Sequence, residues 1–190
     1  HSQASHSQFV DIGYATLNLL VWETENTDAE TILALPGSGG DSSRYRLLGP
    51  LLARAGYRTI AINQRGIMGS TGALDSLTLY DYAGDVIAVA DALEIDKFHL
   101  VGWAMGNRTA RAANTVYPER IASLSLIAAG GLVAPQTEPG ELGQLLGDSS
   151  LTTAEKIYLA KRTLFSPASS EVLVRQYAES LRYWPEARAS

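Results

Sequence analysis

Short apolar runs alternate with amphipathic segments along most of the chain, and this alternation predicts its secondary structure. Continuously apolar runs are typical of strands that are buried on both faces of a sheet, and they occupy residues 31–35, 57–62, 97–102 and 121–129. Apolar residues at helical spacing occupy residues 43–55, 79–93 and 105–117. Strands that alternate with helices in this way predict βαβ units around a parallel sheet.

The amino-terminal residues show a different pattern. Residues 10–22 alternate in polarity and are rich in Val, Ile, Leu and Tyr, which predicts one or two antiparallel strands. Residues 1–9 are mostly polar, start without methionine and lack the apolar core of a signal peptide. We therefore expect residues 1–9 to be disordered, or to be what processing or truncation has left.

The pattern changes again after Gly131. A loose stretch with Pro135, Pro139 and several glycines precedes two amphipathic segments, 153–165 and 169–184, with no apolar strand between them. This arrangement predicts a helical cap over residues 132–190 that follows a core over residues 10–131. Pro50 lies inside the predicted helix at 43–55, so we expect a kink or a late start there.

Composition narrows the function classes. With 190 residues, of which 46% are hydrophobic and 18% charged, the chain is typical of a globular protein rather than a disordered one. The net charge of −5 argues against nucleic acid and anionic membranes as partners, and no apolar stretch is long enough to span a bilayer. The absence of cysteine excludes disulfides, zinc-thiolate sites and thiol nucleophiles. Both a cytoplasmic and a secreted location remain open.

One segment carries candidate chemistry. In FHLVGWAMGNRTAR, residues 98–111, an apolar strand runs into a glycine, three residues, a second glycine and then a helix. This is the context of the nucleophile elbow G-x-S-x-G, whose tight turn needs small residues such as Gly102 and Gly106. The central position, where the elbow carries its nucleophile, is Ala104.

With this elbow, the segment from Thr31 to Gly131 resembles the α/β-hydrolase superfamily in the order and spacing of its motifs. The other similar segments are LPGSG at 35–39 with proline in place of histidine, NQRGIMGS at 63–70 with asparagine in place of aspartate, the helix at 81–95, and YPERI at 117–121. The resemblance implies a three-layer αβα fold with a mostly parallel sheet and a helical cap. It also implies that the C-terminal strands of the fold lie outside this chain.

The resemblance also implies a binding site. Its oxyanion hole would use the backbone N–H groups of Ser38 and Met105. The candidates for lining the pocket are Gly37, Trp103, Asn107 and Arg65, and Asn107 could instead cap a loop. We expect a small-molecule ligand, no cofactor and no metal. The glycines at 37–40 do not form a phosphate loop, because neither a Lys-Ser/Thr pair nor G-x-G-x-x-G spacing follows.

A catalytic triad cannot be assembled from these residues. The family carries its acid and histidine after the cap, whereas the histidines here are His1, His6 and His99. His99 lies in the strand before the elbow, where a core histidine with satisfied hydrogen bonds is the expected role. A methyl group at position 104 cannot form an acyl-enzyme.

Three interpretations of Ala104 remain open. The alanine could replace a serine in order to trap a substrate. It could be native, in a pseudoenzyme that binds a ligand or in an enzyme that uses other groups, or the fold could serve only as an interaction module. We expect an esterase-like hydrolase that acts on an ester-, lactone- or amide-like small molecule and is inactive with Ala104. A pseudoenzyme or ligand-binding protein is the alternative.

The last predicted strand leads to a further expectation. If the sheet stops at residues 121–129, an apolar strand becomes its edge, and natural proteins cover such edges. We therefore expect two further strands, which would come from a continuation of the chain, from a second chain produced by cleavage, or from residues left out of this sequence. If position 104 is natively serine, these strands would carry an acid and a histidine.

Overall fold

The computed structural model of the chain describes residues 4–129, 140–141, 144–145, 148 and 150–180. The chain divides into two compact units, His1–Gly130 and Gly131–Ser190, next to the boundary expected at residue 131.

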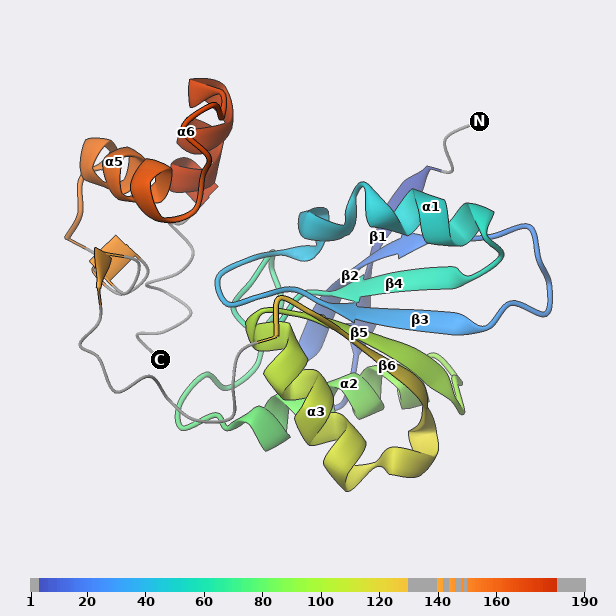
Figure 1. The fold of residues 1–190 in the computed structure, drawn as a ribbon. Coiled ribbons are helices and arrows are strands. Elements are labelled where there is room, and N and C mark those ends of the chain that lie inside the picture. Colours follow the sequence, from blue (N-terminus) through green and yellow to red (C-terminus); the bar gives the residue numbers. More distant parts are fainter. Residues whose placement is uncertain (1–3, 130–139, 142–143, 146–147, 149, 181–190) are drawn as a thin grey trace. The chain divides into compact units, whose positions relative to one another are not determined.

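The first unit is built on a six-stranded sheet with the order β1-β2-β4-β3-β5-β6 (Figure 1). Its strands are β1 Ser5–Asp11, β2 Thr16–Trp22, β3 Thr31–Leu35, β4 Arg58–Ile62, β5 Phe98–Trp103 and β6 Ile121–Ile127. The β1-β2 and β2-β4 pairs are antiparallel, and the β4-β3, β3-β5 and β5-β6 pairs are parallel. The parallel centre predicted from the apolar runs is confirmed.

Strand β1 corrects the expectation for residues 1–9. Residues 5–11 pair along their whole length with residues 16–22 of β2, and the Asn18 side chain donates a hydrogen bond to Ser7 Oγ at 2.8 Å. Only Val10 of this strand is buried. The strand is held mainly by backbone hydrogen bonds to β2. Its side chains are mostly polar and exposed, so the sequence of this segment shows no apolar pattern. Residues 1–3 lie outside the described part of the chain.

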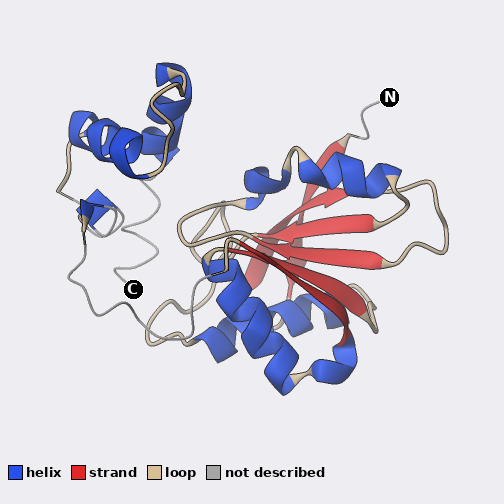
Figure 2. Ribbon diagram, viewed as in Figure 1, coloured by secondary structure: helices blue, strands red, loops and turns tan. Residues whose placement is uncertain are grey.

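Helices cover both faces of the sheet (Figure 2). Helix α1, Leu48–Arg54, lies on one face, and helices α2, Leu79–Ala92, and α3, Met105–Val116, lie on the other. The helix expected at 43–55 starts late, after a short 3₁₀ turn at Ser42–Tyr45. Pro50 therefore lies in the first turn of α1, where no intrahelical acceptor exists for the N–H group that proline lacks.

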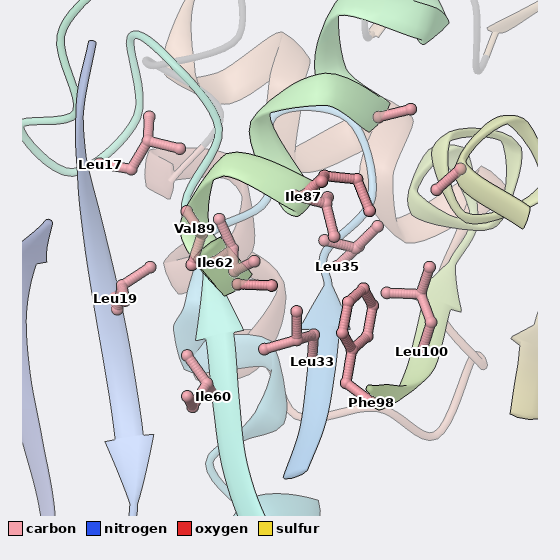
Figure 3. Close-up of a cluster of buried hydrophobic side chains, with 14 of the residues drawn as sticks. Leu17, Leu19, Leu33, Leu35, Ile60, Ile62, Ile87, Val89, Phe98 and Leu100 are labelled. Atoms are coloured by element: carbon pink, nitrogen blue, oxygen red, sulfur yellow. The ribbon is translucent and has the colours of Figure 1, made fainter. Parts of the chain in front are cut away.

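The core forms two layers because successive side chains of a strand point to opposite faces. Leu33 and Leu35 of β3 pack with Phe98 and the helices α2 and α3, whereas Ile32 and Ala34 pack on the α1 side. Figure 3 shows the first of these layers, in which side chains from β2, β3, β4 and β5 meet those of α2. This burial on both faces explains why the central strands are continuously apolar.

Strand β6 is the last strand of the sheet, as expected, and the described residues pair only with its β5 side. Most of its residues are exposed, including Leu126 and Ile127, at 39% and 41%. The two further strands expected beyond β6 remain a prediction.

The second unit contains helices α5, Thr153–Thr163, and α6, Glu171–Ser180. They share a small apolar cluster of Leu145, Leu159, Ala160 and Val174. Thr152 and Glu155 form a capping box at the start of α5. The segment expected at 169–184 is described as far as residue 180. No helix in the described ranges is long and apolar enough to cross a membrane.

Candidate functional site

The turn between β5 and α3 is a strained elbow centred on Ala104. Ala104 has φ 50° and ψ −113°, a conformation that costs a residue with a side chain roughly 1–3 kcal/mol. Two backbone hydrogen bonds hold it there: Ala104 N–H donates to Ile127 O at 3.0 Å, and Asn107 N–H donates to Ala104 O at 3.1 Å. In this conformation Ala104 is exposed at the carboxyl edge of the sheet.

The two glycines around Ala104 are needed because the elbow is closely packed. A Cβ atom on Gly102 would lie 2.5 Å from Asn107 Cα. A Cβ atom on Gly106 would collide with Leu35 O and would lie 2.7 Å from Pro36 O. The helix can therefore follow the strand at this angle only with glycine at both positions.

The loop after β3 lies against the elbow. A Cβ atom on Gly37 would be 3.1 Å from Ala104 Cβ and 3.9 Å from Met105 N. The Ser38 hydroxyl also donates a hydrogen bond to the sulfur of Met105. Gly37, Ser38, Ala104 and Met105, which the sequence motifs singled out, are thus brought together at one edge of the sheet.

The start of α3 gives this edge a favourable field for an oxygen anion. Met105 is the first residue of α3, so its N–H group has no acceptor within the helix. The partial positive charge of a helix amino terminus adds to the effect. The arrangement can polarise a carbonyl, but Ala104 offers no atom that could attack it.

A cavity of about 340 Å³ adjoins the elbow. It is lined by Arg44, Tyr45, Arg46, Leu47, Leu48, Trp103 and Ile127. Trp103 is therefore placed where a wall of the pocket was expected, and the Arg44 guanidinium lies over its ring at 5.5 Å from the centroid. Gly37, Asn107 and Arg65 are not among the lining residues.

Asn107 faces a loop rather than the cavity. It is completely buried, and its side-chain amide donates to Ala128 O at 3.3 Å and accepts from Arg111 at 3.3 Å. Two roles were expected for Asn107, lining the pocket or capping a loop, and the structure shows the second.

Arg65 does not fit the expected role in lining the pocket. It is 8% exposed and forms two hydrogen bonds with Asp85, at 2.9 Å from Nε and 2.6 Å from Nη2. Its remaining nitrogen, Nη1, donates to Ala73 O at 3.2 Å. The hydrogen bond to Asp85 raises the pKa of Arg65 above its ordinary value. This arginine joins the loop after β4 to helix α2 and serves the fold.

Asn63, where the family pattern has aspartate, belongs to a buried neutral network. Its side-chain oxygen accepts from Ser42 N at 2.7 Å, and its amide donates to Asn18 Oδ1 at 2.7 Å and to Ser42 Oγ at 3.1 Å. Ser70 Oγ donates to Asn63 O at 3.0 Å. All of these residues are buried. The network fixes the beginning of the 3₁₀ turn that carries Arg44 and Tyr45.

Sequence reasoning missed the residues of this 3₁₀ turn. The hydroxyl of the buried Tyr45 donates to Leu35 O at 2.8 Å, directly before the loop that contains Gly37, and burial raises its pKa above the ordinary value. Arg44 and Arg46 bring positive charge to the cavity. The sequence offered one hint of their role: the segment Arg44–Arg46 follows the glycine-rich loop at 37–40 by only a few residues.

The histidines of the described chain lie away from the elbow. His99 is near the amino-terminal end of β5, five residues before Ala104, which corresponds to roughly 16 Å along a strand. Its Nδ1 is 2.8 Å from Ser123 Oγ and its Nε2 is 3.5 Å from Glu30. His99 is therefore a residue of the fold, but its buried Nε2 has no hydrogen-bond partner, so the expectation of a histidine with satisfied hydrogen bonds is wrong. His6 lies in β1, at the opposite edge of the sheet.

Known proteins share this sequence pattern. A family model described as "alpha/beta hydrolase fold" matches residues 30–182. A 2-hydroxy-6-oxo-6-phenylhexa-2,4-dienoate hydrolase of Burkholderia cepacia is 36% identical over 148 residues, which cover 73% of this chain and 50% of that protein. A dihydrolipoyllysine-residue acetyltransferase component of the acetoin cleaving system from Pseudomonas putida is 38% identical over 115 residues, covering 60% and 31%. The chain spans about half the length of the first of these relatives.

Solved structures share the fold. The 2-hydroxy-6-oxo-6-phenylhexa-2,4-dienoate hydrolase of Rhodococcus sp. strain RHA1 superposes with a TM-score of 0.78 at 19% identity, covering 98% of this chain and 69% of that one. A carboxylesterase of Bacillus subtilis superposes with a TM-score of 0.77 at 18% identity, covering 98% and 64%. At these identities the likeness extends to the fold alone.

Proposed function

The chain belongs to the α/β-hydrolase fold family, and on that premise we propose that it binds an ester-, lactone- or amide-like small molecule with the carbonyl over Ala104. The observation that carries the proposal is the approach of Gly37 to the strained elbow, where an added Cβ would be 3.1 Å from Ala104 Cβ. Glycine at 37 lets the loop after β3 lie against Ala104 with no side chain between them. A carbonyl beside this contact would lie next to the loop and to the start of α3.

The carbonyl oxygen would be held by the backbone N–H groups of Ser38 and Met105. Backbone donors do not depend on the side chain at position 104, so this part of a hydrolase site is independent of the missing serine. The amino terminus of α3 adds partial positive charge. The cavity that Trp103 lines beside the elbow would receive the apolar part of the ligand.

With Ala104, hydrolysis through an acyl-enzyme on this residue is chemically excluded, because a methyl group has no electron pair to donate. We therefore propose a chain that binds such ligands without turning them over. The names of the relatives include a dienoate hydrolase and an acetyltransferase component. They support a small-molecule carbonyl site and leave the substrate undefined.

The alternative is a native pseudoenzyme or binding protein, rather than a hydrolase whose serine has been replaced. Asn63 favours this alternative, because it stands where the family pattern has aspartate and is integrated into a buried network with Asn18 and Ser42. Because a triad cannot be assembled from this chain, Ala104→Ser is expected to gain no turnover under either interpretation.

The experiment is to titrate dimethyl suberate, a neutral diester, into the whole chain and to follow both binding and methanol release. We expect binding without methanol release. Gly37→Ala should weaken the binding, because its Cβ would crowd Ala104 and push the loop away from the elbow. Gly84→Ala is the matched control, since a Cβ added at residue 84 meets nothing within 4 Å.

Two results would contradict the proposal. Methanol release well above the uncatalysed rate would mean that another nucleophile operates. Binding that Gly37→Ala leaves unchanged, in a variant that remains folded by circular dichroism, would place the ligand elsewhere.

A further inference from the structure

The sulfur chemistry of this chain is confined to two methionines. The chain has no cysteine, and its two methionines are Met68 and Met105. A thioether is polarisable and is readily oxidised to a sulfoxide, which turns an apolar side chain into a polar one. Any effect of a mild oxidant on the sulfur atoms of this chain must therefore arise at one of these two residues.

The two methionines have different surroundings. Met68 lies in the loop after β4 and is 49% exposed. Met105 is partly buried, and it opens helix α3 directly after the strained elbow at Ala104. Its sulfur accepts a hydrogen bond from the hydroxyl of Ser38 at 2.6 Å. Oxidation of Met68 would add an oxygen on the surface, whereas oxidation of Met105 would add one beside the loop after β3.

The surroundings of Met105 suit its oxidised form better than its reduced form. A thioether sulfur is only a weak hydrogen-bond acceptor, whereas a sulfoxide is polar and its oxygen carries partial negative charge. The Ser38 hydroxyl, which already points at the sulfur, is within reach of such an oxygen. The amino terminus of α3 also favours negative charge at this position. Two features of the fold thus stabilise a sulfoxide at Met105.

Hydrogen peroxide is an oxidant that completes this reaction without a further reactant. A lone pair of the Met105 sulfur attacks one peroxide oxygen, the O–O bond breaks, and the proton on the transferred oxygen passes to the leaving hydroxide. The products are the sulfoxide and one molecule of water. The sulfur loses two electrons and the peroxide gains them.

The added oxygen would lie in the proposed binding site. The loop and the helix are close there, because a Cβ atom on Gly37 would be 3.9 Å from Met105 N. The backbone N–H groups of Ser38 and Met105 are the donors proposed for the oxygen of a ligand. A sulfoxide oxygen on Met105 would carry the same kind of partial charge beside the same two residues. It would therefore compete with the ligand oxygen for room and for donors.

We propose that Met105 is a site of reversible oxidation, and that its sulfoxide, held by the Ser38 hydroxyl, closes the carbonyl site beside Ala104. The closure rests on the proposed function, because it assumes a ligand oxygen at the N–H groups of Ser38 and Met105. The oxidation and its hydrogen bond to Ser38 do not depend on a ligand. Methionine sulfoxide reductases, one for each epimer of the sulfoxide, reverse the modification.

The test uses two chains with a single methionine each, Met68→Leu and Met105→Leu, in which leucine has a similar volume. Each chain is treated with hydrogen peroxide, and the added oxygen is located by peptide mass spectrometry. In the Met68→Leu chain we expect oxidised Met105 and an affinity for dimethyl suberate that falls about tenfold, the effect of one lost hydrogen bond. Both reductases with dithiothreitol should restore it. In the Met105→Leu chain, peroxide should oxidise Met68 and leave the affinity of that chain unchanged.

A second measurement tests the Ser38 hydroxyl without any ligand. In the Met68→Leu background, Ser38→Ala removes this hydroxyl, and Ser43→Ala removes one from an exposed serine of the 3₁₀ turn. Oxidation should lower the thermal unfolding midpoint of the Ser38→Ala chain more than that of the Ser43→Ala chain, because only the first lacks the donor to the sulfoxide. Equal shifts in the two chains would overturn the role of Ser38.

The outcomes separate this inference from the proposed function. If Met105 stays reduced under conditions that fully oxidise Met68, the inference is wrong. If Met105 is oxidised and dimethyl suberate binds as before, the closure is wrong while the proposed function stands. If the reduced chain does not bind the ester, the proposed function and the closure both fail, and the mass and unfolding measurements still decide whether Met105 is oxidised and held by Ser38.

Discussion

Tyr45 donates its phenolic O–H to the carbonyl oxygen of Leu35 at 2.8 Å, and this bond ties the turn before α1 to the end of β3. Leu35 is the last residue before the loop that brings Gly37 against Ala104. Both partners are buried. One hydrogen bond thus connects the wall of the cavity with the loop over the elbow.

Replacing this tyrosine should weaken the fold measurably. Tyr45→Phe leaves the carbonyl of Leu35 without the phenol donor, so we expect the free energy of unfolding to fall by about 1–2 kcal/mol. Urea denaturation measures the change. Tyr80→Phe is the control, because Tyr80 is 62% exposed and its hydroxyl stays in water. Equal losses in the two variants would refute the structural role of the bond.

The same tyrosine predicts sensitivity to alkali. Burial raises the pKa of Tyr45 in the folded chain above the ordinary value of 10.0. The unfolded chain therefore releases this proton at lower pH than the folded chain does, so the contribution to stability is complete below pH 10 and is lost as the pH rises above it. In urea denaturation at increasing pH, the parent chain should lose stability above pH 10 more steeply than Tyr45→Phe. Parallel curves would contradict this cause.

The close packing of the elbow predicts a contrast between two glycines. Gly106→Ala would drive a Cβ into Leu35 O and Pro36 O, which are backbone atoms that cannot yield, and should destabilise the chain by about 3 kcal/mol or more. Gly84→Ala lies in helix α2 with open space around its Cβ and should stabilise the chain by up to about 1 kcal/mol. A stable Gly106→Ala variant would mean that α3 does not follow β5 as described.

Much of this fold could be predicted because burial on both faces leaves a continuous apolar signal. The strands β3, β4 and β5 show this signal. Gly102 and Gly106 mark the turn after β5, where the nearby backbone leaves no room for a side chain. Strand β1 could not be found in this way. Its pairing uses backbone groups, and only Val10 turns into the core.

The contacts of individual site residues were harder to predict, because they depend on partners that are distant in sequence. Arg65 pairs with Asp85, twenty residues away on α2, and Arg44 meets Trp103 only after both segments reach the same edge of the sheet. The place of Ala104 at the elbow, in contrast, can be predicted from local sequence, because the strand, the two glycines and the helix follow one another along the chain.

The strain at the elbow gives a further prediction. Glycine tolerates φ 50° without the penalty that a side chain incurs, so Ala104→Gly should raise the free energy of unfolding by about 1 kcal/mol. Ala112→Gly, in the interior of α3, should lower it by about the same amount. Thermal unfolding of the two variants should therefore shift in opposite directions, and a loss of stability in both would refute a strained turn at 104.

In the proposed site, the N–H groups of Ser38 and Met105 hold a ligand oxygen over Ala104. The most direct measurement is the ¹⁵N–¹H spectrum of the whole chain during titration with dimethyl suberate. We expect the amide resonances of Ser38 and Met105 to shift together, with a common dissociation constant, and Gly37→Ala to weaken both responses. Saturable binding that leaves both resonances unmoved would contradict it.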